Sequence, residues 1–168
     1  GESISKMSHD IQLLIKESVS REQEKREMEI KMLQYQINPH FLYNTLNSIK
    51  WMAAMQGSKG IVEMLSSLGK LLKMAFNNKN EKISIREELD ILDHYISIQR
   101  VRYKGKVSFC KNIISQDVLD CSIVKFILQP LVENAIFHGI EPKDGIGQIV
   151  LTVEKGDKYV MVTITDDG

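Results

Sequence analysis

Several residue types are scarce in this sequence, and each shortage excludes a class of protein. Cys110 and Cys121 are the only cysteines and lack CxxC spacing, so we expect reduced cytosolic thiols, with no disulfide framework or zinc site. The 22 basic and 22 acidic residues give a formal charge of zero, which gives no reason to expect nucleic acid as a partner. No apolar run approaches the roughly 20 residues that cross a bilayer.

The chain of 168 residues is long enough for one ordinary domain or two small ones. It has no initiator methionine and no signal peptide, and it stops directly after a strand-like segment, at Asp166-Asp167-Gly168. We therefore expect it to be a piece of a longer protein.

Prolines are also few, and Pro39 interrupts a long helical pattern. Without an N–H to bond the carbonyl of Tyr35, it predicts a kink or a restart of the helix. His40 follows on the exposed shoulder of that kink, and Asn44 shares its helical face. A neutral imidazole is a good nucleophile near neutral pH. The alternative is that Asn38 caps a new helix starting at Pro39 and that His40 has no chemical role.

A heptad pattern precedes and follows this point. Its apolar positions are Ile4, Met7, Ile11 and Leu14, and then Met28, Met32, Tyr35, Leu42, Leu46 and Ile49. The intervening positions Ser18, Arg21 and Lys25 are polar, which predicts a weak two-stranded coiled coil that serves as a signalling connector. A merely solvated helix over residues 18–29 is the alternative.

Two apolar-periodic segments joined by a short loop predict a helical hairpin. Residues 57–60 end the first helix, and a second follows from Ile61 to Phe76 before residues 77–80 stop it. Neither helix can bury its apolar face alone. Two chains are therefore expected to form a four-helix bundle, a homodimer with His40 on its outer surface.

The second half of the chain mixes helix and strand patterns. Ser84 and Glu87 fit a capping box that opens a helix reaching about Tyr103. Strands are predicted over 107–114, 149–154 and 159–165, the last two joined by a hairpin turn. A domain boundary is expected near residues 79–84 or 104–106.

An apolar helix is predicted over residues 126–139, and it carries a small polar cluster of Glu133, Asn134 and His138. Gly139 is expected just past its end. Polar groups on such a face are costly unless satisfied, and magnesium or a nucleotide phosphate would satisfy them. Asp166 at the end of the last strand can accept a hydrogen bond from an exocyclic amine, and Gly168 would let backbone approach a ligand.

Together these stretches resemble the kinase core of bacterial sensor histidine kinases, most closely the LytS/YesM type. Residues 36–44 look like the histidine box of that family, residues 128–139 like its N box, and residues 166–168 like the start of its first glycine box. Residues 95–103 match a further block. The resemblance covers about residues 30–168.

The resemblance implies an α+β fold in three parts. These are a coiled-coil signalling helix over 1–28, a dimerisation and histidine phosphotransfer hairpin over 29–80, and a linking helix with the first part of a Bergerat-type (GHKL) ATP-binding sandwich over 81–168. It also implies that the parent protein is anchored in the cell membrane through segments outside this sequence, with this portion in the cytoplasm.

The resemblance further implies roles for individual residues. His40 would take the γ-phosphoryl group of ATP and pass it to an aspartate on the receiver domain of a response regulator, and Asn44 would orient water or the regulator. Asn134 would hold Mg²⁺ on the phosphates, Asp166 would bind the adenine amine, and Glu133, His138 and Gly168 belong to the same nucleotide-binding boxes. Positioning and charge neutralisation should dominate such a transfer.

The sequence departs from related patterns at several positions. Phe41 stands where many histidine kinases place an acid, so the group that polarises His40 is not evident. Pro130 stands where hydrolysing relatives carry a glutamate, and Glu133 lies about 100° around the helix from Asn134 and cannot take over that role. The second glycine box and the ATP lid are not in the sequence, so we expect this piece to bind ATP weakly and not to phosphorylate itself.

Two other function classes remain open. One is a non-catalytic dimerisation and signalling module in which the boxes survive as structure. The other is an ATPase or serine-kinase relative on the same nucleotide fold, against which Pro130 and the histidine hairpin argue.

Overall fold

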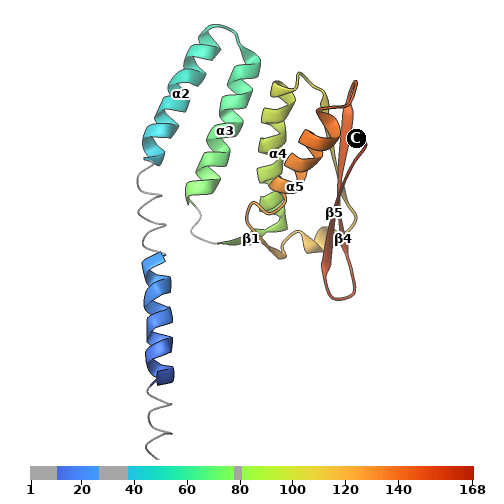
Figure 1. The fold of residues 1–168 in the computed structure, drawn as a ribbon. Coiled ribbons are helices and arrows are strands. Elements are labelled where there is room, and N and C mark those ends of the chain that lie inside the picture. Colours follow the sequence, from blue (N-terminus) through green and yellow to red (C-terminus); the bar gives the residue numbers. More distant parts are fainter. Residues whose placement is uncertain (1–10, 27–37, 78–80) are drawn as a thin grey trace, which may run out of the picture. The chain divides into compact units, whose positions relative to one another are not determined.

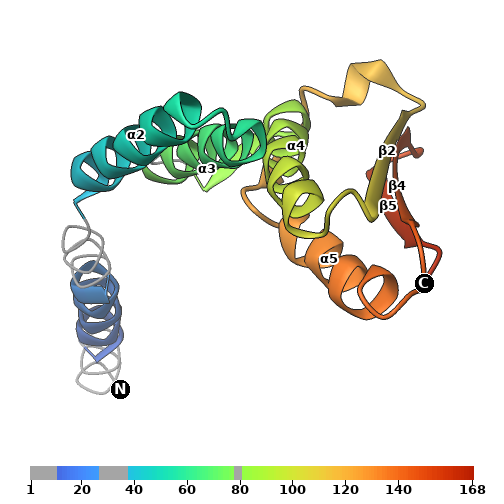
Figure 2. The same cartoon turned by 90° about the horizontal axis from the view of Figure 1, so that it is seen from above.

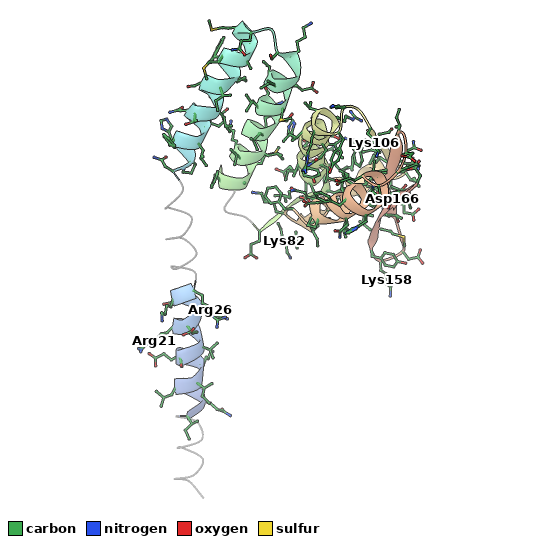
Figure 3. All side chains as sticks on the ribbon, turned by 45° about the horizontal axis from the view of Figure 1, so that its top comes forward. Arg21, Arg26, Lys82, Lys106, Lys158 and Asp166 are labelled. Carbon is green, nitrogen blue, oxygen red and sulfur yellow. The ribbon has the colours of Figure 1, made fainter. Side chains whose placement is uncertain are left out.

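The computed structural model describes residues 11–26, 38–77 and 81–168. Contacts divide the chain into two compact units, residues 1–42 and residues 43–168. In the first unit, residues 11–26 form a helix with exposed side chains. Arg21 and Arg26 (Figure 3) pair with the carboxylates of Glu17 and Glu22, at N···O distances of 2.7 and 3.6 Å. These pairs, spaced four residues apart, support a solvated helix.

The predicted heptad seam is only partly described. Ile11 and Leu14 are exposed on the helix of residues 11–26, where a second chain would have to cover them. The remaining apolar seam positions before Pro39 lie outside the described residues: Ile4, Met7, Met28, Met32 and Tyr35. The coiled coil therefore stays a prediction.

Helix α2 (Pro39–Met55) begins at the proline. The side-chain Oδ1 of Asn38 accepts hydrogen bonds from the backbone N–H groups of His40 and Phe41, at 3.1 and 3.2 Å. This is the arrangement of an N-cap with proline at the first helical position. The local geometry is thus the one in which a capped helix starts at Pro39, and the residues before it that would show a kink are outside the described part.

The helical hairpin is confirmed. Helix α2 ends just before Gly57, whose φ of 71° is in the left-handed region that favours glycine. Helix α3 (Lys59–Asn77) follows and runs antiparallel to α2 (Figure 1). Apolar side chains of α2 that could meet a second chain stay exposed, among them Trp51 and Met55 at 70% and 87%.

The rest of the second unit is mixed α and β, which confirms the predicted α+β class. Its elements, in chain order, are β1 (Lys82–Ser84), α4 (Ile85–Arg102), β2 (Val107–Ile113), a 3₁₀ turn (Gln116–Val118), β3 (Ser122–Val124), α5 (Gln129–Asn134), a π-helical segment (Ala135–Ile140), β4 (Gly147–Lys155) and β5 (Val160–Asp166). Strands β2, β4 and β5 form one sheet in that order, with β2 parallel to β4 and β5 antiparallel to it. Helices α4 and α5 cover one face of this sheet (Figure 2).

A single core joins these two helices to the sheet. Strand β4 alternates buried and less buried residues, as a half-covered strand should. The fully buried side chains include Leu92 and Ile96 of α4, Val132 and Ile136 of the α5 segment, and Ile149 and Leu151 of β4. Because Val132 and Ile136 are buried in this core, the packing also determines which other side chains of the α5 segment can point toward β5.

The predicted capping box is present at the start of α4. The Ser84 side chain accepts from the backbone N–H of Glu87, and the Glu87 carboxylate accepts from the backbone N–H of Ser84 at 2.8 Å. The hydrogen bond from the Ser84 backbone is the main reason that the pKa of Glu87 lies below its ordinary value. The pair Ser84 and Glu87 in this way fixes where α4 begins.

Three features differ from the sequence-based expectation. The short antiparallel pair β1–β3 was not predicted, because three-residue strands carry too little pattern. The helix predicted over 126–139 begins only at Gln129, since Phe126 has a left-handed φ of 60°. Gly139 does not follow the helix end but lies inside the last, π-helical turn, where it is buried.

Candidate nucleotide site

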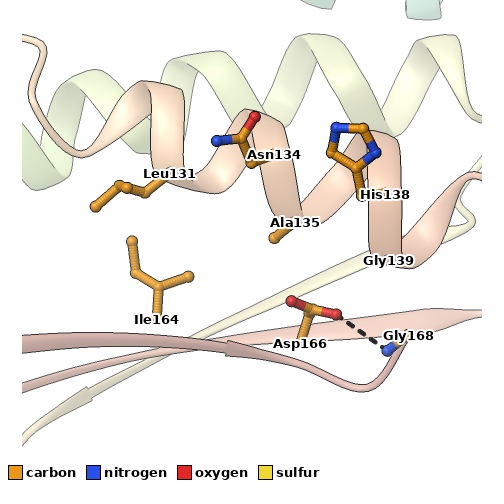
Figure 4. Close-up of a pocket in the computed structure, with 8 residues that line it drawn as sticks. All are labelled: Leu131, Asn134, Ala135, His138, Gly139, Ile164, Asp166 and Gly168. Atoms are coloured by element: carbon orange, nitrogen blue, oxygen red, sulfur yellow. Dashed lines mark hydrogen bonds between the residues drawn. The ribbon is translucent and has the colours of Figure 1, made fainter.

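A pocket of about 570 Å³ opens between the α5 segment and the end of β5 (Figure 4). The helical segment contributes Leu131, Asn134, Ala135, His138 and Gly139, and the strand contributes Ile164, Asp166 and Gly168. Asn134 and His138 are four residues apart, so they share one face of the helical segment. Ile164 and Asp166 are two residues apart and share one face of the strand. The pocket therefore has polar groups on both walls and apolar surface between them.

Four of the residues singled out from the sequence meet in this pocket: Asn134, His138, Asp166 and Gly168. Glu133 does not line it. The charge of Glu133 instead acts on Tyr95 of α4, whose pKa is raised to about 12, mainly because its hydroxyl is buried. The absence of Glu133 from the pocket lining agrees with its offset of about 100° from Asn134.

His40 and Asn44 lie on the first turns of α2, and both are exposed. Each takes part in interactions of that region. His40 belongs to the first unit, while Asn44 and the pocket belong to the second. The separation of four residues puts both side chains on one helical face, as the sequence predicted.

The pocket wall depends on a close approach at Gly139. A Cβ on Gly139 would lie 2.3 Å from Oδ1 of Asp166, and a Cβ on Gly168 would lie 2.2 Å from the Cα of Gly139. Both positions therefore need glycine, which lets the strand end lie directly against the helix. Oδ1 of Asp166 also accepts a hydrogen bond from the backbone N–H of Gly168, at 3.1 Å. These contacts hold the carboxylate at the mouth of the pocket.

Lys143 and Asp167 form a second restraint that the sequence analysis missed. The Lys143 ammonium donates to the backbone oxygen of Asp167 and contacts its Oδ2, both at 2.8 Å. Oδ1 of Asp167 accepts from the backbone N–H of Gln148, also at 2.8 Å. The loop after the π-helical segment is thereby tied to the strand end that carries Asp166. Only the acidic side chain at position 167 could have indicated a charged partner.

This restraint should depend on pH. The hydrogen bond from Lys143 is the main cause that lowers the pKa of Asp167 below its ordinary value. A lowered carboxyl pKa stabilises the folded state above the unfolded pKa, near about 4, and that contribution is lost as pH falls through the folded pKa.

Asp167→Asn should therefore lower the unfolding temperature at pH 7, and only slightly, because exposed ion pairs contribute little. The difference from wild type should shrink below about pH 4. Thermal unfolding followed by circular dichroism between pH 7 and 3 measures it, and an equal difference at both ends would contradict the prediction.

A single methyl group should disturb the pocket. In Gly139→Ala the added Cβ would overlap Oδ1 of Asp166, so the carboxylate must turn away. The affinity of the full-length protein for the adenine nucleotide that the resemblance leads us to expect should then fall about tenfold, the size of one lost charged hydrogen bond. Gly105→Ala is the matched control for the loss of a glycine, because a Cβ there meets nothing within 4 Å, although its left-handed φ adds backbone strain. Isothermal calorimetry with ATP compares the two variants, and equal losses would show that the contact with Asp166 is irrelevant.

Among the residues that the structure describes, no group of three or more histidine, cysteine, aspartate or glutamate side chains forms a metal site. Across the same residues, no helix is both long and apolar enough to span a membrane.

Comparisons with known proteins agree with these motifs. The family model described as histidine kinase matches residues 28–107. Over 162 residues the chain is 41% identical to the sensor histidine kinase YesM of Bacillus subtilis (strain 168), covering 96% of this chain and 28% of YesM. It is 34% identical over 155 residues to the sensor histidine kinase YpdA of Escherichia coli (strain K12), covering 89% and 27%. With the sensor protein LytS of Staphylococcus saprophyticus it shares 28% identity over 144 residues, covering 85% and 24%.

The chain thus spans about a quarter of the length of these three relatives. The similarity to YesM extends over almost all of the chain. The chain belongs to the sensor histidine kinases of the LytS/YesM type.

Proposed function

We propose that this chain carries the phosphoacceptor hairpin and the nucleotide pocket of a sensor histidine kinase in a two-component system. The observation that supports it best is the pocket itself. Asn134 and His138 from one helical segment face Asp166 from a strand end across about 570 Å³. Polar side chains from two separate elements thus converge on one concave site, which is typical of a ligand-binding pocket.

The lining of the pocket fits adenine nucleotide. The carboxylate of Asp166 can accept a hydrogen bond from the exocyclic amine, while Leu131, Ala135 and Ile164 offer apolar surface to the base. Glycine at positions 139 and 168 lets the strand end lie against the helix, which places the Asp166 carboxylate beside the helical wall of the pocket. These residues bind and orient the nucleotide.

The donor set also fits magnesium. The amide oxygen of Asn134 is a hard ligand of the kind that this ion prefers, and Mg²⁺ takes its other ligands from phosphate and water. A cluster of several carboxylates is therefore not required. When bound, the ion would neutralise charge on the phosphates. His138 lies four residues further along the same face, where its imidazole can donate a hydrogen bond to a phosphate oxygen.

His40 is the proposed phosphoryl acceptor. The ring nitrogen without hydrogen forms a bond to the γ-phosphorus, the bond from that phosphorus to the bridging oxygen breaks, and the electron pair leaves with ADP. The other ring nitrogen keeps its proton. The phosphoryl group then passes to an aspartate on a response regulator. Asn44, on the same face, orients the regulator or a water molecule.

The chain is proposed to act as a homodimer. The exposed apolar side chains of α2, such as Trp51 and Met55, support a bundle with a second hairpin. The heptad pattern supports a coiled coil ahead of it that passes a signal from a membrane-anchored receptor portion.

The experiment that tests the proposal uses the full-length protein with magnesium and ATP labelled at the γ-phosphate. We expect label that is lost in acid, as phosphohistidine is, and that maps to the peptide containing His40. Acid-stable label would indicate a serine kinase instead. Absence of label, with ATP binding demonstrated, would favour the non-catalytic signalling module.

A further inference from the structure

Glu88 of α4 is a charged side chain at the centre of the second unit, and nothing above uses it. Its exposed fraction is 0%. Burying a carboxylate is costly unless hydrogen bonds satisfy it. Here Oε2 accepts from the backbone N–H of Phe126 at 2.8 Å, and Oε1 accepts from that of Leu128 at 2.9 Å. Both donors belong to the turn that leads into α5.

That turn combines an unusual backbone conformation with a helix start that has no side-chain cap. Phe126 has a φ of 60°, which residues other than glycine rarely adopt. Leu128 occupies the N-cap position of α5 but makes no side-chain cap, and Pro130 in the first turn has no N–H. Pro130 is a usual local signal for starting a helix, but the side-chain cap is missing, and a carboxylate from another helix takes the place of that cap.

Lys125, the residue before Phe126, ties the turn to two further segments. The backbone N–H of Lys125 donates to the carbonyl of Glu81 at 2.9 Å, and its ammonium donates to the carbonyl of Met74 in α3. The turn is thus connected to the end of α3, while Glu88 connects it to α4. A change at this turn would be passed along α5, since the helix is continuous from Gln129 into the π-helical segment.

We propose that Glu88 is a positioning residue for the magnesium–nucleotide site. By holding the backbone at Phe126 and Leu128, its carboxylate sets where α5 begins and therefore where the amide of Asn134 lies in the pocket. This inference rests on the proposed role of Asn134 as a magnesium ligand. A residue that positions a metal ligand, without binding the metal itself, still affects the affinity for the metal.

The effect of Glu88 should appear in the magnesium-dependent part of nucleotide binding. In Glu88→Gln one carboxylate oxygen becomes an NH₂ group that cannot accept from a backbone N–H, so one of the two hydrogen bonds is lost. We expect ATP affinity in the presence of Mg²⁺ to fall about tenfold or more. The affinity for ATP in the presence of a magnesium chelator should fall by a smaller factor, because Asp166 and Ile164 lie on β5 and only Leu131 and Ala135 of the base-facing surface move with α5. Asp90→Asn is the matched control, since Asp90 is an exposed carboxylate on the same helix.

The test measures ATP affinity by calorimetry on the full-length protein, with Mg²⁺ and with chelator, alongside the unfolding temperature. Equal losses under both conditions, or no loss under either, would overturn the positioning role while leaving the proposed function intact. A wild-type protein whose ATP affinity does not depend on magnesium would overturn the proposed role of Asn134 and this inference with it. Glu88→Asp, which keeps the charge but is one methylene shorter, decides by the same comparison if Glu88→Gln does not fold.

Discussion

His40→Gln is expected to abolish phosphate acceptance completely while leaving the dimer intact. Glutamine has no ring nitrogen that can form a bond to phosphorus, so no partial activity should remain. The side chain at position 40 is exposed, and substitutions at such positions usually change stability little. The measurement is acid-labile label on the full-length protein after incubation with magnesium-ATP, with the dimer mass determined by light scattering.

His94→Gln is the matched control for this prediction. His94 lies on α4 and is half-buried, and burial, followed by the charge of Lys70, lowers its pKa. We expect this variant to accept phosphate at close to the wild-type level. Residual label in His40→Gln would show that another residue accepts phosphate. A monomeric His40→Gln protein would instead indicate a structural histidine.

A mixing experiment extends the same prediction to the dimer. The full-length protein with His40→Gln keeps the proposed nucleotide site, and the 168-residue chain supplies an unmodified His40. In mixed dimers with magnesium-ATP, label on the shorter chain would show that phosphate crosses between subunits. No label, with mixed dimers confirmed by mass, would favour transfer within one subunit or a non-catalytic module.

Asn134→Ala is expected to remove the magnesium-dependent part of ATP binding. Asn134 lines the pocket from the helical wall (Figure 4). Loss of one interaction with a charged group costs about 1.5–3 kcal/mol, which corresponds to a decrease in affinity of about tenfold to a hundredfold. Calorimetry on the full-length protein, with Mg²⁺ and with chelator, measures this decrease. Binding of ATP in the presence of chelator should be nearly unchanged.

Asn112→Ala serves as the control for the loss of an asparagine amide. Asn112 is exposed on β2 and does not line the pocket. The ATP affinity of the Asn112→Ala protein should therefore equal that of the wild type. If Asn134→Ala retained wild-type affinity with magnesium, the magnesium role would be wrong. A parallel Glu133→Gln variant examines the remaining residue of the predicted cluster, whose charge acts on Tyr95.

Much of the local structure could be predicted because its causes are local in the sequence. The capping box at Ser84, the glycine at position 57 and the alternation along β4 each depend on residues within a few positions of one another. The approximate limits of α3, α4, β2, β4 and β5 were predictable for the same reason. The π-helical segment was not, since no residue pattern distinguishes it from an α-helix.

The composition of the pocket was predictable only in part. Asn134, His138 and Asp166 were identified from their types and from their places on a helix and at a strand end. Whether Glu133 joined them depended on which face of α5 packs on α4. That choice is made by the core, where Val132 and Ile136 are buried, and the helix is thereby rotated so that Glu133 does not line the pocket.

By itself, the sequence determined the kinds of element, their order along the chain and the chemical groups available for phosphoryl transfer. Only the tertiary structure decided which groups meet. The contacts of Glu88 with Phe126 and Leu128 join residues 38 and 40 positions apart, and Gly139 lies against Asp166. Such contacts depend on how whole helices and strands pack, because side chains fill a core together and no short stretch of sequence contains both partners.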